Sequence, residues 1–245
     1  MSLASLDQRR RAARRRLALL ATGILIGGAG VTAFFVLGPG GSSDDASKHD
    51  VSPSASAPAV APTGGSNTPT LLPKAKEVKE GVPVGYPHTL EGAISAAAHY
   101  TDANDLFTPE AAERQARVIA EPNYLGMIGS YARMSAQQVR KSRGLPENGE
   151  SDTANFYVNQ ARAYSVASAE SDKVTVWLLV DATISVKGVS ENANQVRGAI
   201  MVWADGDWKM SFDSLNDLPD SKPSSAVPGS PQALAEGWRA LAYEK

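Results

Sequence analysis

The stretch Lys173-Val-Thr-Val-Trp-Leu-Leu-Val-Asp-Ala-Thr-Ile-Ser-Val-Lys187 decides the fold of this chain. Every second residue is apolar, and this series would share one face of a strand: Val174, Val176, Leu178, Val180, Ala182, Ile184 and Val186. A period of two predicts a long antiparallel strand with one buried side. Thr175, Asp181, Thr183 and Ser185 then lie on the opposite, non-core face.

The segments on either side predict a meander. Residues 160–169 form the expected hairpin partner across Glu170-Ser171-Asp172. Residues 196–204 and 207–213 flank Asp205-Gly206, a dipeptide strongly favoured in two-residue hairpin turns. Together these segments predict a four-stranded antiparallel sheet.

Three helices are expected before the sheet. The first begins after Thr89, a plausible N-cap, and the second at Thr108-Pro109-Glu110. The third covers about residues 124–142, where apolar residues recur at helical spacing. Helices followed by a meander predict an α+β domain over residues 83–215, with the helices on one face of a curved sheet.

Residues 216–245 form a tail rich in proline and serine. Ser230-Pro231 has the signature of a helix start, and Leu234, Trp238 and Leu241 continue one face. Gly237 weakens the prediction of a helix in this tail.

The N-terminus predicts a membrane anchor. Residues 1–16 contain six arginines, and residues 17–38 are an uninterrupted apolar run long enough, at about 33 Å, to span a bilayer. The arginines place residues 1–16 in the cytoplasm and the rest of the chain outside it. Val31-Thr32-Ala33 resembles a signal-peptide cleavage site, but Phe34-Phe35-Val36-Leu37 continues the run beyond it. Residues 39–82, rich in Ser, Pro and Ala, are expected to be a disordered linker.

Charge and composition exclude several functions. Beyond residue 16 the chain has 18 basic and 25 acidic residues, which disfavours direct nucleic-acid binding by the exported part. The absence of cysteine excludes disulfides and thiol chemistry. No metal-binding or nucleotide-binding motif is present, so we expect no metal and no cofactor.

Two segments carry a family resemblance: Gly85-Tyr86-Pro87-His88-Thr89 and Val202-Trp-Ala-Asp-Gly-Asp-Trp-Lys-Met210. With the basic N-terminus, the single apolar span and the linker, the chain resembles the exported scaffold subunits of actinobacterial conjugation and type IV secretion systems. The resemblance covers about residues 83–213 and the anchor. It implies a nuclear-transport-factor-2-like cone, a non-enzymatic scaffold in the cell membrane, other secretion or conjugation proteins as partners, and self-association.

An enzyme or small-ligand-binding cone is the alternative, and a lipid or peptidoglycan sensor is a third. The chain has three histidines, of which His49 lies in the linker and His88 precedes the first helix. His99 is expected to be structural, since a lone helical histidine is seldom a catalytic base. A His99–Asp181 pair would form only if Asp181 faced the interior of the cone.

Seven residues are candidates for contacts with partners. Trp203 and Trp208 flank the Asp-Gly turn and are either a partner interface or cross-strand packing. Arg140, Lys141 and Arg143 end the third helix, where they either complement its dipole or form a docking patch. Gly23 and Gly27 have the spacing that lets membrane helices approach closely, although glycine is common in such helices.

Overall fold

The computed structural model describes residues 66–212, 218–220 and 222–243. The chain divides into two compact units, residues 1–45 and 46–245, and every described residue belongs to the second. Within the described ranges, no helix combines the length and the apolar character needed to cross a bilayer. The predicted span at residues 17–38, with Gly23 and Gly27, lies outside them, as do residues 1–16 and His49.

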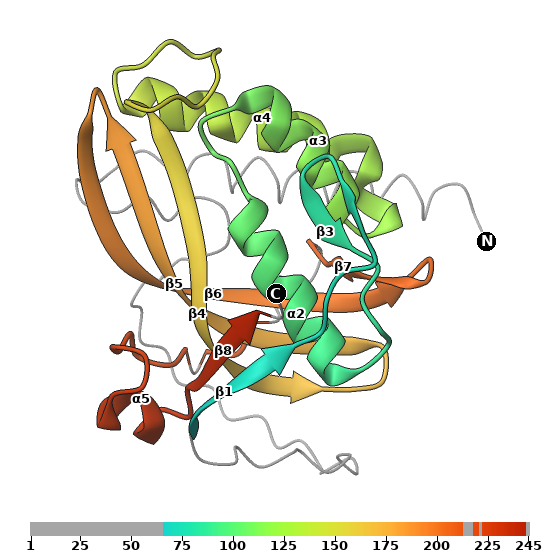
Figure 1. Ribbon diagram of the computed structural model, residues 1–245. Coiled ribbons are helices and arrows are strands. Elements are labelled where there is room, and N and C mark those ends of the chain that lie inside the picture. The colour runs from blue at the N-terminus through green and yellow to red at the C-terminus, as the bar shows by residue number, and fades with distance from the viewer. Residues whose placement is uncertain (1–65, 213–217, 221, 244–245) are drawn as a thin grey trace, which may run out of the picture. The chain divides into compact units, whose positions relative to one another are not determined.

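The main sheet of the described part has six strands in the order β1-β8-β4-β5-β6-β7 (Figure 1). Four consecutive strands form an antiparallel meander: β4 (Phe156–Ala169), β5 (Lys173–Val186), β6 (Val189–Ala204) and β7 (Asp207–Met210). β8 (Arg239–Tyr243) pairs with β4, and β1 (Ser66–Leu72) runs parallel to β8 at the edge. A separate hairpin joins β2 (Glu77–Lys79) to β3 (Val82–Val84).

The predicted fold class, a four-stranded antiparallel sheet in a nuclear-transport-factor-2-like cone, is wrong. The sheet of the described residues is wider by two strands and mixed, because β1 and β8 are parallel. Neither added strand shows the alternation of β5. β1 lies in the Pro- and Thr-containing end of the predicted linker, and β8 lies where a helix was expected. Tertiary pairing outweighs local propensity in both segments.

The three helices before the meander are confirmed. They are α2 (Leu90–Ala103), α3 (Pro109–Ile119) and α4 (Leu125–Ser142), with a 3-10 turn at Pro122–Tyr124 before α4. Thr89 caps α2 by accepting a hydrogen bond from the backbone of Gly92 at 3.1 Å. Residues 92–98 of α2 are all buried, so this helix is surrounded by protein.

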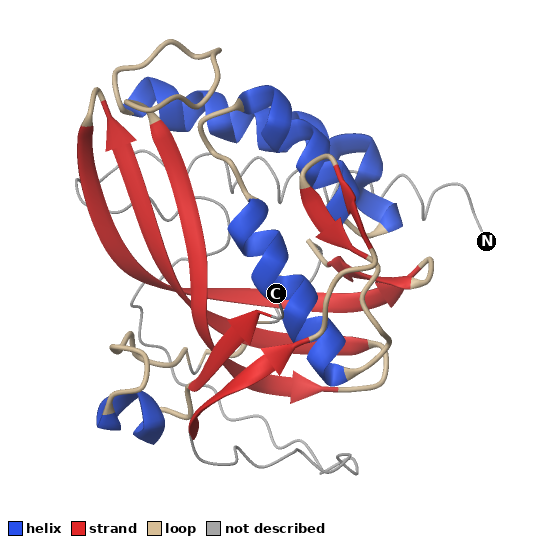
Figure 2. Cartoon of the chain, viewed as in Figure 1, coloured by secondary structure: helices blue, strands red, loops and turns tan. Residues whose placement is uncertain are grey.

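The helices form two groups around the sheet. α2 lies against the sheet and contacts β4, β5, β6 and β7. α3 and α4 pack against each other beyond one end of α2, near the tips of the long strands (Figure 2). The side chains of Arg143 at the end of α4 and Glu191 near the start of β6 form an exposed ion pair at 3.3 Å.

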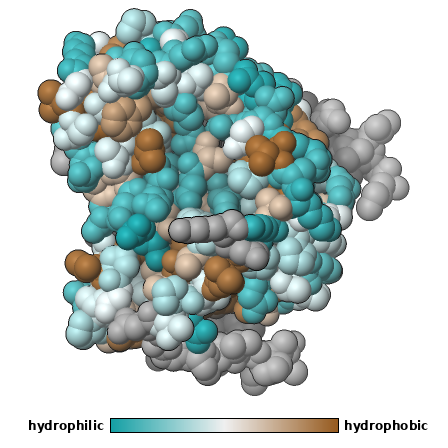
Figure 3. Space-filling view, in the orientation of Figure 1, coloured by the Kyte–Doolittle hydropathy of each residue, from teal (hydrophilic) through white to brown (hydrophobic). Residues whose placement is uncertain are grey.

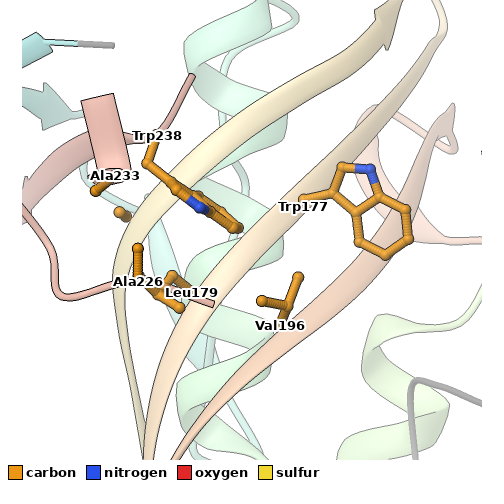
Figure 4. Close-up of a cluster of buried hydrophobic side chains, with 7 residues drawn as sticks. Trp177, Leu179, Val196, Ala226, Ala233 and Trp238 are labelled. Carbon is orange, nitrogen blue, oxygen red and sulfur yellow. The ribbon is translucent and has the colours of Figure 1, made fainter. Parts of the chain in front are cut away.

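β5 is buried on both faces along its central part, residues 174–180, and not on one face as predicted. The predicted face packs toward α2. The opposite face carries Trp177 and Leu179, which the C-terminal segment covers with three side chains (Figure 4). These are Ala226, Ala233 and Trp238.

The C-terminal segment is part of the domain. After α5 (Pro231–Ala235), Gly237 adopts a φ of +79° and the chain turns into β8. This left-handed conformation stops the helix that the apolar spacing predicts. Gly198 on β6 makes room for the tail, because an added Cβ would lie 2.7 Å from the Leu218 side chain and 2.9 Å from Trp177.

Candidate functional site

The two segments that carry the family resemblance meet in the structure. One oxygen of the buried Asp207 carboxylate accepts hydrogen bonds from the backbone N–H groups of Gly85 and Tyr86, both at 3.1 Å. The Tyr100 hydroxyl donates to the Trp208 carbonyl at 2.8 Å, which ties α2 to β7. The Asp205-Gly206 turn has positive φ at both residues, as the predicted hairpin requires. The contacts of this junction are therefore accounted for by folding.

Trp203 and Trp208, the first candidate interface, pack within this junction. Trp208 is 1% exposed, and its indole N–H donates to the Pro87 carbonyl at 2.9 Å. Trp203 is partly buried and stacks on the His88 ring, with 4.1 Å between centroids and 8° between planes. His88 Nε2 also lies 2.8 Å from the Asp172 carboxylate. The stack joins the entry to α2 with the ends of two hairpins.

The basic group at the end of α4 is divided among three structural contacts. Arg140 is 5% exposed, and its guanidinium donates to the carbonyls of Phe107 at 2.6 Å and Pro146 at 2.7 Å. Lys141 pairs with Glu147 at 2.8 Å, and Arg143 pairs with Glu191. Arg140 is therefore buried within the domain, whereas Lys141 is exposed and Arg143 partly exposed.

His99 and Asp181 do not meet. His99 Nδ1 lies 2.9 Å from the carbonyl oxygen of Ser95, on the α2 side of the sheet, and burial lowers the pKa of its ring. Asp181 lies on the opposite face, where it pairs with Arg162 at 3.5 Å. The sheet separates the two residues.

A buried polar cluster lies instead between the end of α2 and the sheet. It consists of Arg197 and Gln195 on β6 and Tyr157 and Asn159 on β4, and we call it the Arg197 cluster. Arg197 Nη2 donates to the Tyr157 hydroxyl at 2.5 Å, to Asn159 Oδ1 at 3.0 Å and to Gln195 Oε1 at 2.6 Å. Because these partners come from both neighbours of β5, the guanidinium lies over the α2-facing side of that strand.

The Arg197 cluster is joined to the last turn of α2. The side-chain amide of Asn159 donates to the carbonyls of Thr101 at 3.2 Å and Asn104 at 3.4 Å. A helix end leaves such carbonyls without i+4 partners, and the Thr101 carbonyl also accepts from the Asn104 backbone N–H at 3.4 Å. The Asn159 side chain therefore both binds carbonyls at the end of α2 and positions Arg197.

Asp102 is the acidic group beside this cluster. It accepts hydrogen bonds from the Ala161 backbone at 2.7 Å and from the Tyr243 hydroxyl of β8 at 2.5 Å. Burial raises the pKa of Asp102 to about 6, although these hydrogen bonds and the positive charge of Arg197 act in the opposite direction. Burial and the Asp102 charge raise the pKa of Tyr243. Asp102 thus holds the end of β8 against α2.

Two buried polar atoms of the described residues have no hydrogen-bond partner there: the Tyr86 hydroxyl oxygen and Asn104 Nδ2. Asn104 belongs to the α2 end that Asn159 contacts. Tyr86 stacks on His99, with 5.5 Å between ring centroids, and the His99 ring lies 4.5 Å from that of Tyr243. Unpartnered buried polar groups are rare in proteins. Asn104 adjoins the Arg197 cluster, whereas Tyr86 is linked to Asp102 through the rings of His99 and Tyr243.

Sequence reasoning missed this site, although one signal was present. Arg197 interrupts the apolar run around Val196 and Ile200 on a segment predicted to be a strand. A charged side chain inside such a run is rarely buried unless polar or charged groups bind it. Its partners Asn159 and Gln195 lie outside this apolar run, and only the pairing register of the strands shows that they contact Arg197.

The described residues contain no group of three or more His, Asp or Glu side chains placed to hold a metal ion. The chain belongs to a family described as a domain of unknown function (DUF8175), whose model matches residues 63–230. The match ends before β8. No curated protein matches the chain, and no solved structure does.

Proposed function

We propose that this protein is a membrane-anchored, non-enzymatic interaction subunit of a conjugative transfer or type IV secretion apparatus. The observation that carries the non-enzymatic part is the separation of His99 from Asp181 by the sheet. This was the catalytic pair that the sequence offered, and each member has a structural partner instead. The Arg197 cluster supports the runner-up, a small-ligand-binding domain.

The cellular part of the proposal rests on sequence. Six arginines followed by the apolar run at 17–38 favour an anchor with the acidic domain outside the cytoplasm. The choice of apparatus rests on the resemblance in segment order and in the two segments that meet at Asp207, not on the shape of the sheet. Other membrane proteins of such a system, and further copies of this chain, are the partners we propose.

The surface is compatible with interaction by dispersed contacts. Figure 3 shows apolar residues scattered among hydrophilic ones on the viewed face of the domain. The large apolar side chains that are exposed come from different elements, among them Val158 of β4 at 52% and Met134 of α4 at 64%. Single exposed apolar residues are normal, so partners must be found by experiment.

The test is photo-crosslinking of the full chain in the membranes of the strain that carries it. A photoreactive amino acid at Val158 or Met134 samples two surfaces, and the same amino acid at the exposed Val227 samples the C-terminal segment. We expect reproducible crosslinks to membrane proteins or to a second copy, and loss of DNA or protein transfer when the gene is deleted. Absence of crosslinks at all three positions together with normal transfer would contradict the proposal.

Topology is tested separately. Alkaline phosphatase fused after Lys245 should be active, because that enzyme requires export. An inactive phosphatase fusion together with a fluorescent cytoplasmic reporter at the same position would refute the proposed orientation.

A further inference from the structure

We propose that Arg197 is the anion-binding residue of a ligand site on the α2-facing side of the sheet, and that its ligand carries a carboxylate. This inference goes beyond the interaction role proposed above and does not depend on it. It rests on the hydrogen bonds of Arg197, on its unoccupied Nη1 and on the charges of the region.

The first argument is the missing counter-ion. Arg197 is 7% exposed, yet all its hydrogen bonds go to neutral side-chain oxygens, those of Tyr157, Asn159 and Gln195. Within the described part of the chain it forms no ion pair, and Asp102 acts on it only through space. A buried cation without a bonded anion is costly, and a carboxylate ligand would remove that cost.

The second argument is the geometry of the guanidinium. Nε and Nη2 are occupied by the cluster, whereas Nη1 donates to no described residue. Nη1 is also not among the fully buried unpartnered atoms, so it retains accessible surface. Three fixed neighbours therefore orient the plane of the guanidinium and leave one end of it free to donate. The free Nη1 of a preoriented guanidinium can donate charge-assisted hydrogen bonds to an anion such as a carboxylate.

The third argument is the nature of the other unmet groups. Asn104 Nδ2 is a donor, and the Tyr86 hydroxyl can donate. Both atoms are fully buried, so the accessible donor of this region is Arg197 Nη1, and its ligand must supply an acceptor. Because the acidic Asp102 already places negative charge beside the guanidinium, a singly charged ligand meets less repulsion there than a doubly charged phosphate. A monocarboxylate, either a small free acid or the C-terminal end of a peptide, fits these conditions.

The test uses the full chain purified in mild detergent. Thermal unfolding is followed at pH 7 with increasing sodium acetate, and with sodium chloride at the same ionic strength as the reference. We expect acetate alone to raise the melting temperature in a saturable manner, since a ligand that binds only the folded state stabilises it. The guanidinium NMR signal of Arg197 should shift over the same concentration range.

Two variants and a control assign the effect. Gln195→Glu places a carboxylate beside Arg197 and should abolish the response to acetate without unfolding the protein. Arg197→Lys should weaken acetate binding at least tenfold, whereas Arg162→Lys, on the opposite face, should leave it unchanged. The Gln195→Glu result stands even if Arg197→Lys does not fold.

The source of the carboxylate is distinguished with peptides. Tighter binding of acetyl-Ala-Ala than of acetate, and none of its C-terminal amide, indicates a peptide end. Equal binding of acetate and peptide indicates a small acid. The proposal is overturned if acetate has no more effect than chloride on melting and on the Arg197 signal, or if Gln195→Glu responds to acetate as the parent does.

Discussion

Replacing the small Asp207 side chain should lower the stability of this domain strongly. Its carboxylate accepts hydrogen bonds from the backbone of Gly85 and Tyr86, which lie more than 120 positions earlier in the chain, and from its neighbour Trp208 at 2.9 Å. Asp207→Ala leaves at least two backbone N–H groups without an acceptor in a partly or fully buried setting. At about 1.5–3 kcal/mol for each of two charge-assisted bonds, the expected loss of stability is about 3–6 kcal/mol.

The assay is thermal unfolding followed by circular dichroism. For a domain of this size the loss corresponds to a fall in melting temperature of about 10 °C. Asp207→Asn keeps one acceptor oxygen and should lose only about 1–2 kcal/mol. Asp205→Asn is the matched control, because it removes the same charge from the same hairpin at an exposed turn position with φ of +54°.

The ordering of these variants tests the reasoning. Asp207→Ala should be much less stable than Asp207→Asn, and Asp205→Asn should melt close to the parent protein. If Asp207→Ala melts within about 2 °C of the parent, the junction between residues 85–86 and β7 contributes little, and the proposed structural role of the two signature segments is refuted.

Three further predictions follow from burial and charge. Leu178→Asp should cost several kcal/mol, because it places an unpaired charge among residues that are 0% exposed, whereas Val189→Asp at 69% exposure should melt like the parent. Arg140→Ala should cost about 2–4 kcal/mol by leaving buried carbonyls unsatisfied, whereas Lys141→Ala should leave the melting temperature unchanged. Equal effects of the two variants would contradict the structural role of Arg140. Because the folded-state pKa of Asp102 is raised to about 6 from 3.8, its ionisation costs stability above pH 6 and this cost disappears as the pH falls toward 4. The free energy of unfolding of Asp102→Asn, relative to that of the parent, should therefore decline by about 2–3 kcal/mol between pH 7.5 and pH 4. A difference that stays constant with pH would contradict the raised pKa of Asp102.

The parts of the fold that the sequence predicts are those with strong local signals. Alternation fixes β5 and its α2-facing side, and Asp205-Gly206 fixes the last hairpin. Thr89 and Thr108-Pro109 mark the starts of α2 and α3. In each case the local preference and the tertiary environment favour the same structure.

The width of the sheet could not be predicted, because it depends on pairing between distant segments. β1 includes Pro69, a residue confined to edge strands, and its ladder partner β8 is about 170 residues further along the chain. Residues 238–243 have an apolar spacing that suits a helix, but the turn at Gly237 and pairing with β4 and β1 make most of this segment a strand. Local sequence contains neither of these pairings.

The candidate interface residues show the same limit in another form. Trp208 and Arg140 belong to residue types common at interfaces, but both are buried by their own domain. The residue type suggested an interface, but the sequence did not show whether these side chains are exposed. For Arg197 the sequence offers one signal, its place in an apolar run, but only the register with Gln195 and Asn159 shows that its partners are neutral groups.

The C-terminal segment links the two faces of the sheet. Trp238 packs on the side opposite α2, with Trp177 and Leu179, and its indole N–H donates to the Ser224 carbonyl at 3.0 Å. Five residues later, Tyr243 donates to Asp102 at the end of α2, beside the Arg197 cluster. The same short segment, residues 238–243, therefore completes the apolar cover of one face and the polar boundary of the other. Because both contacts depend on the docking of β8, a ligand bound beside Arg197 would stabilise the C-terminal segment through Asp102, and displacement of that segment would weaken the ligand site.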